Sequence, residues 1–158
     1  MPILPLLQSA SNWAPIVFIR DSKYGMPVAE SFHLMGLTIL LATVVVLDLR
    51  LAGLGRNDYE ISWLARKLKP WTVGAIVLVM SSGLLIFLGT PGKYLDSRPF
   101  RLKMVLLCCA ILFHFGVLRR FTAGDSVARP VVNVAVALLS LTLWFGVGWA
   151  GRAIAFIP

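Results

Sequence analysis

The chain has 158 residues, of which 58% are hydrophobic and only 14% are charged. A soluble domain of this length could not bury so much apolar surface, so the composition excludes an ordinary soluble protein and indicates a helical membrane protein. The formal net charge is +8. The basic residues lie between apolar segments, where they anchor helix ends and contact anionic lipid, and nothing in their pattern indicates nucleic-acid binding.

Four apolar segments of roughly 20 residues are each long enough to cross about 30 Å of hydrocarbon. In chain order they cover residues 27–49, 71–90, 99–118 and 130–150. Proline stands at or near the start of three of them, which suits the first turn of a helix. The sequence therefore predicts an all-α fold, a single domain over residues 1–158 that forms an integral membrane four-helix bundle.

The connecting segments are short. Residues 3–19 are apolar but interrupted by proline, and we expect them to form an interfacial helix before the first span. Residues 57–69 have apolar residues at helical spacing, which predicts an amphipathic helix on the membrane surface. The stretch "TPGKYLDSRP" predicts a turn-rich loop. Trp144 and Trp149 are expected at the membrane–water interface.

Basic residues are divided almost evenly between the two sides of the predicted bundle. Eight lie on one side, at Arg50, Arg56, Arg66, Lys67, Lys69, Arg119, Arg120 and Arg129. Seven lie on the other, at Arg20, Lys23, Lys93, Arg98, Arg101, Lys103 and Arg152. The positive-inside rule then favours an orientation with both termini outside the cytoplasm.

Ionisable side chains are costly inside a membrane, so each one in or near a span is a candidate functional residue. The candidates are Glu30, His33, Asp48, Lys103 and His114. His33 and Lys103 follow the starts of two spans that run in the same direction, so they lie at a similar depth. His114 is eleven residues beyond Lys103, roughly 16 Å further along the helix. His33 and His114 therefore cannot easily bind one haem from its two faces.

Three interpretations of the shallower group remain open. In the first, Glu30 and Lys103 form an ion pair that holds the first span to the third, and His33 is hydrogen-bonded beside it. In the second, His33 and Lys103 bind or flank a haem on its two faces. In the third, Glu30 and His33 belong to a metal site, because Glu-x-x-His is the ligand motif of di-iron bundles; that motif needs a second copy, which the sequence lacks.

The opposite ends of the same two spans carry further polar residues. Asp48 and Arg50 close the first span, and Arg119 and Arg120 close the third, which predicts an interfacial salt-bridge cluster. His114 is interpreted either as a buried, hydrogen-bonded histidine or as a ligand for a cofactor near that face. The run of Ser81, Ser82 and Gly83 predicts a close helix contact, since small residues let membrane helices approach.

Two stretches, "ESFHLMGLTILLATVVVLDLRLAGLGR" and "FRLKMVLLCCAILFHF", resemble a family of small bacterial four-helix membrane proteins. More distantly, they are similar to the superfamily of CopD-type copper-resistance domains and HemJ-type protoporphyrinogen oxidases. In the HemJ type, a histidine near the start of one helix and a lysine near the start of a later helix form the functional pair, and haem b is bound. The matching residues are His33 and Lys103, with His114 eleven positions after the lysine and Arg50 closing the first helix.

The resemblance implies a bacterial inner-membrane protein that binds haem b. We expect it to pass electrons between a quinone or a tetrapyrrole and an outside partner, and the distribution of basic residues favours periplasmic termini. His33 would be the principal iron ligand and Lys103 the second ligand or a partner of the propionates. Glu30 would orient His33 or relay a proton. The tryptophan and glycine expected midway along the first helix are absent, so the haem site carries over more readily than the oxidase activity.

Two other functions are weighed against a haem-binding redox protein or oxidoreductase. One is a membrane component that transports copper or another small solute. The other is a cofactor-free structural subunit of a larger membrane complex or homo-oligomer. The second of these would tolerate replacement of His33, whereas a haem protein would not.

Overall fold

The computed structural model describes residues 3–54, 60–123, 130–154 and 156. Every regular element in that part of the chain is a helix. Four helical segments are long and apolar enough to cross a membrane, which confirms the predicted all-α, four-span architecture. They are α3 (Gly25–Leu51), α4 (Ile61–Gly89), the run of α6 (Arg98–Leu112), η1 (Phe113–Leu118) and α7 (Arg119–Ala123), and α8 (Pro130–Ala153).

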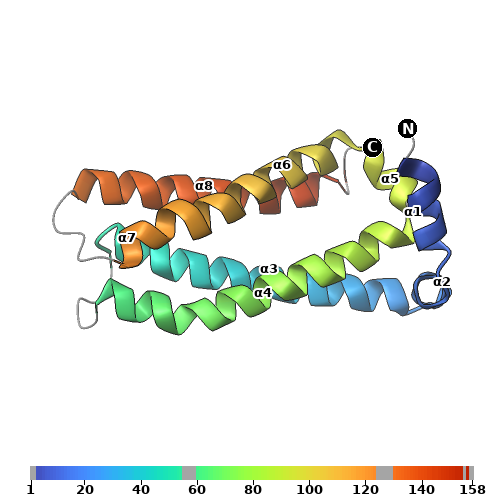
Figure 1. Cartoon of the computed structure of the whole chain (residues 1–158), viewed down its shortest axis with the longest axis horizontal. Helices are drawn as coiled ribbons and strands as arrows, with labels where there is room; N and C mark the ends of the chain where they lie inside the picture. Colours follow the sequence, from blue (N-terminus) through green and yellow to red (C-terminus); the bar gives the residue numbers. More distant parts are fainter. Residues whose placement is uncertain (1–2, 55–59, 124–129, 155, 157–158) are drawn as a thin grey trace.

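The bundle is built from two closely packed pairs, α3 with α4 and α6 with α8, and contacts between α3 and α8 join the pairs (Figure 1). The buried core at the middle includes Leu40, Val44 and Trp144, while many large apolar side chains point outward, as lipid-facing residues do. Trp144 is only 1% exposed, so its predicted interfacial position is wrong; Trp149 is 70% exposed. Trp144 is buried because its face of α8 meets α3 and α6.

Two predicted boundaries differ from the structure. The predicted surface helix and the second span form one continuous helix, α4, which passes through Pro70; residues 57–59 lie outside the described residues. Proline within a membrane helix is tolerated because local adjustment and neighbouring groups satisfy the freed carbonyl. The predicted loop before the third span contains a short helix, α5 (Pro91–Leu95).

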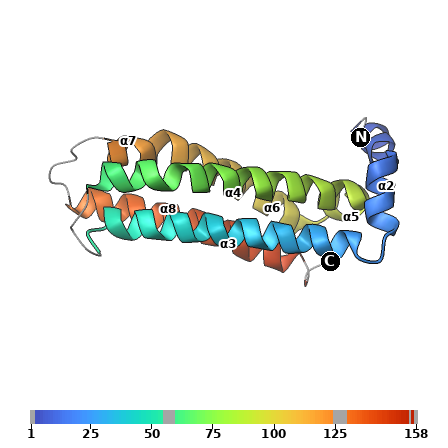
Figure 2. The same ribbon diagram turned by 90° about the horizontal axis from the view of Figure 1, so that it is seen from below.

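Two short helices, α1 (Ile3–Ser11) and α2 (Ala14–Asp21), replace the single interfacial helix predicted for residues 3–19. The helical conformation is interrupted between them at Asn12 and Trp13, and a proline stands in the first turn of α2. Both helices lie across one end of the bundle, where α1 contacts α5 and α2 contacts α3 and α4 (Figures 1 and 2). Trp13 and Phe18 are 66% and 77% exposed there, which suits a position at the membrane surface. We call this the α2 end of the bundle.

The close approach of α3 and α4 depends on Gly36. A Cβ atom on this residue would lie 2.9 Å from Val79 Cγ2, whereas a Cβ on Gly74 of α4 would meet nothing within 4 Å. We expect Gly36→Ala to lower the free energy of unfolding by about 1–3 kcal/mol through overpacking. Gly74→Ala should be neutral or stabilising by up to roughly 1 kcal/mol, because alanine favours the helix. Thermal unfolding of both variants in detergent checks this, and equal effects would contradict it.

Candidate functional site

His33 of α3 and Lys103 of α6 face each other between the two helix pairs. Lys103 Nζ lies 3.4 Å from His33 Nε2. Both side chains are only partly exposed. The predicted proximity of these two residues is therefore confirmed, although they are separated by 70 positions in the sequence.

Ser82 of α4 holds the other side of the imidazole ring. Its Oγ lies 3.1 Å from His33 Nδ1, and its own hydroxyl proton is donated to the carbonyl of Leu78, one turn earlier. Because that proton is already used, Nδ1–H has to be the donor to Ser82. Nε2 is then unprotonated and accepts from Lys103. The three side chains form one directional chain of hydrogen bonds, from Lys103 through His33 to Ser82.

Two glycines make room for this arrangement. A Cβ atom on Gly83 would lie 3.1 Å from His33 Cε1, so α4 presents bare backbone to the imidazole ring. A Cβ atom on Gly151 of α8 would lie 3.4 Å from both Cε and Nζ of Lys103. The predicted close helix contact at residues 81–83 is confirmed. The specific role of Ser82 was missed, because a serine in a small-residue run gives no signal of its partner.

An aromatic cluster covers the site on the side of the α2 end. Phe87 of α4 stacks on Phe100 of α6 with centroids 5.5 Å apart, and Tyr94 of α5 packs against both. Phe87 is four residues beyond Gly83, and Phe100 is three residues before Lys103, so the cluster lies about one turn from the His33–Lys103 pair. It therefore lies between the pair and the α2 end of the bundle. This cluster was not predicted, since its members come from three separate elements.

Glu30 is exposed and lies near Tyr94 rather than at the imidazole ring. Burial raises the pKa of the Tyr94 phenol above its usual value, and the Glu30 carboxylate raises it further. No ion pair joins Glu30 to Lys103, although both residues lie in the described part of the chain. The predicted ion pair is wrong because Lys103 extends toward His33 and Gly151. Ser82, not Glu30, orients His33.

His114 lies apart from this site, as its position in the sequence predicted. It belongs to the π-helical turn η1 and packs edge-on against Trp144, with centroids 6.3 Å apart. Among the described residues its buried Nδ1 has no hydrogen-bond partner. His114 is therefore buried, as one interpretation predicted, but the predicted hydrogen bond is absent at Nδ1. A role as a cofactor ligand stays a prediction.

The predicted salt-bridge cluster at the far end of α3 is not formed by Asp48. In the described structure neither carboxyl oxygen of Asp48 has a hydrogen-bond partner, and the residue is 0% exposed. Arg119 and Arg120 are exposed instead. Asp48 points into the bundle toward α8, whereas long arginine side chains at helix ends extend to the surface.

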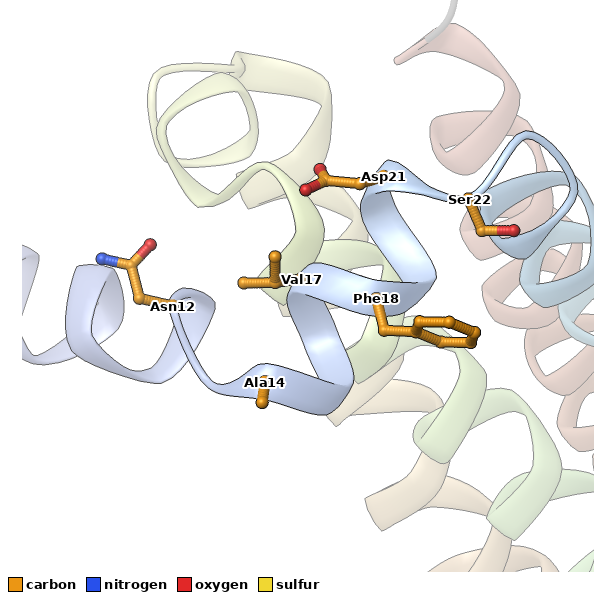
Figure 3. A pocket seen from close by; sticks show the side chains of 6 residues that line it. All are labelled: Asn12, Ala14, Val17, Phe18, Asp21 and Ser22. Atoms are coloured by element: carbon orange, nitrogen blue, oxygen red, sulfur yellow. The ribbon is translucent and has the colours of Figure 1, made fainter.

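The structure also has an open hollow of about 750 Å³ beside α2, lined by Asn12, Ala14, Val17, Phe18, Asp21 and Ser22 (Figure 3). None of the predicted site residues lines it. The described residues contain no group of three or more histidine, cysteine, aspartate or glutamate side chains placed to hold a metal ion. No third side chain of these types therefore joins Glu30 and His33, which the di-iron interpretation requires.

The fold and the site define a four-span α-helical membrane protein whose first and third spans share a partly buried histidine–lysine pair. The chain belongs to a family of unknown function, DUF6644, whose model matches residues 13–157. No curated protein and no solved structure matches the chain. The matched range includes all four spans and every residue of the site.

The hydrogen-bond chain predicts the tautomer of His33. We expect nitrogen NMR of labelled protein to show His33 protonated at Nδ1 and unprotonated at Nε2, because Ser82 accepts and Lys103 donates. Ser82→Ala should reduce the population of this tautomer. Ser81→Ala is the matched control, because Ser81 is exposed and bonds only its own helix. A protonated Nε2 in the wild type would contradict the assignment.

The position of Glu30 predicts the titration of Tyr94. Removing the negative charge with Glu30→Gln should lower the pKa of the Tyr94 phenol, and burial should still hold it above the usual value. Ultraviolet titration of the tyrosinate band measures this. Tyr94→Phe identifies the Tyr94 contribution, and Glu60→Gln is a control at another exposed glutamate. An unchanged titration in Glu30→Gln would contradict the predicted coupling.

Proposed function

We propose that this protein is a haem-b-binding redox protein of the membrane and that His33 is its principal iron ligand. The observation that supports this most directly is the arrangement around the imidazole ring. Ser82 accepts from Nδ1–H, so the lone pair of Nε2 is directed toward α6. A histidine that binds a metal commonly donates its other ring N–H to a fixed acceptor in this way.

The donor set fits an iron centre with one adjustment. His33 would hold the iron through Nε2, and Lys103 would be the nearest further donor. Nε2 and Nζ are 3.4 Å apart, which requires Lys103 to withdraw slightly. Its long side chain can do so, either to remain as the second ligand or to contact a propionate.

His33 and Lys103 would hold the haem where the two closely packed helix pairs face each other. α3 packs with α4 and α6 packs with α8, whereas α4 and α6 are not among the closely packed pairs. The aromatic cluster of Phe87, Tyr94 and Phe100 would limit access of water from the α2 end. Exclusion of water and the apolar bundle would tune the reduction potential of the bound iron.

Bound haem would supply one-electron chemistry, and the chain would supply the axial ligand, the fixed tautomer and the apolar surroundings. We also propose that the first and third spans are distantly related to those of HemJ-type and CopD-type membrane proteins, on the positions of His33, Lys103 and His114. The electron partners would be a quinone or a tetrapyrrole in the membrane and an outside protein. Whether the protein acts as an oxidoreductase depends on those partners.

We place the protein in the bacterial inner membrane with both termini in the periplasm. The small excess of basic residues on the side of the first and third loops supports this orientation. The α2 end, with the His33–Lys103 pair nearest to it, would then face the periplasm.

Absorbance spectroscopy of the protein, expressed with ample haem and purified in detergent, tests the proposal. We expect a Soret band and, after reduction with dithionite, a resolved α-band. His33→Ala should remove both bands, and Lys103→Met should shift the spectrum or weaken binding several-fold. His114→Ala should retain the Soret band, because His114 lies on another part of the bundle; loss of the band would instead identify His114 as a ligand.

A colourless wild-type protein would overturn the proposal. Bound copper or solute-dependent transport without a chromophore would instead favour a transport component. Normal function of His33→Ala in a complex with other chains would favour a structural subunit.

A further inference from the structure

A second buried polar group lies near the opposite end of the bundle from α2. Asp48 of α3 and Ser140 of α8 are both 0% exposed. In the described structure both carboxyl oxygens of Asp48 and the hydroxyl oxygen of Ser140 lack hydrogen-bond partners. Ser140 is nevertheless the polar side chain that faces the Asp48 carboxyl from the neighbouring helix.

The surroundings of Asp48 are otherwise apolar. The adjoining buried cluster consists of Leu47, Leu51, Leu118 and Ala137. One turn from Ser140 along α8, Trp144 is almost fully buried as well. No described side chain hydrogen-bonds to this carboxyl, and transfer of an isolated carboxylate into apolar surroundings is prohibitively costly.

The titratable side chains of the elements around Asp48 do not reach it. Arg66, Lys67 and Lys69 of α4 and Arg119 and Arg120 at the start of α7 are exposed. His114 of η1 packs against Trp144 and Phe115. Arg50, on α3 itself, makes an interaction of its own but does not hydrogen-bond to either Asp48 oxygen. None of these side chains hydrogen-bonds to the Asp48 carboxyl.

We propose that Asp48 and Ser140 form a proton-binding site within the membrane, in which Asp48 is a neutral carboxylic acid that donates its proton to Ser140 Oγ. A protonated carboxyl gains the one donor that a carboxylate lacks, and a serine oxygen is an acceptor. Ser140 can in turn donate to a carbonyl one turn earlier in its own helix. Both bonds would form on rotation of the two side chains.

A proton fits this site better than a metal cation does. The site offers three side-chain oxygens, whereas calcium and magnesium take six or more oxygen ligands. No group of three acidic, histidine or cysteine side chains is present among the described residues. A buried, protonatable aspartate in a membrane helix is the kind of residue that takes part in proton relays. The site is separate from His33 and does not depend on the haem proposal.

Infrared spectroscopy of the full chain in lipid vesicles tests the proposal. At neutral pH the wild type should show the C=O stretching band of a protonated carboxylic acid, and deuterium oxide should shift that band. Asp48→Asn should abolish the band while preserving the size and shape of the side chain. Asp96→Asn is the matched control at an exposed aspartate and should leave the band unchanged.

Two further measurements keep the proposal testable if Asp48→Asn folds poorly. Ser140→Ala should shift the band without removing it, because the acid loses its acceptor; an unshifted band would overturn Ser140 as the partner. Absence of the band in the folded wild type would overturn the proton site. A rise in thermal stability with sodium chloride over choline chloride, lost in Ser140→Ala, would overturn it in favour of a metal cation.

Discussion

A polar side chain in the hydrocarbon of a bilayer has no water to bond, so it needs a partner from its own or a neighbouring helix. In this protein the constraint is met between His33, Lys103 and Ser82, which come from three different spans. Lys103 donates to Nε2 of His33, and His33 donates from Nδ1 to the hydroxyl oxygen of Ser82. The resulting chain fixes the direction in which the imidazole presents its lone pair, and the proposed chemistry depends on that direction.

Small residues allow this polar layer to form. Gly83 brings the backbone of α4 against the imidazole ring, and Gly151 gives Lys103 space beside α8. Gly36 sets the approach of α3 to α4 one turn further into the bundle. Without a hydrophobic effect between helices in lipid, such close packing is a main source of helix association. The same glycines that hold the helices together therefore also shape the site.

The two ends of the bundle satisfy their buried polar groups to different extents. At the α2 end, His33 has partners on both ring nitrogens. Near the other end, the described structure leaves Asp48, Ser140 and Nδ1 of His114 without partners. His33 is held by protein side chains alone. The unpartnered atoms of Asp48 and Ser140 leave room for the exchangeable proton that we propose. This difference separates the residues of the proposed iron site from those of the proposed proton site.

Hydropathy and length by themselves determined the four spans, and helix periodicity with span direction placed His33 and Lys103 at one depth. Those properties are local, because the thickness of the bilayer and the rise of a helix fix them. The tertiary structure alone decided that Lys103 turns to His33 rather than Glu30, that Ser82 fixes the tautomer, and that Asp48 faces Ser140 rather than an arginine. These outcomes depend on how each helix is rotated about its axis, and that rotation is set by packing against distant parts of the chain.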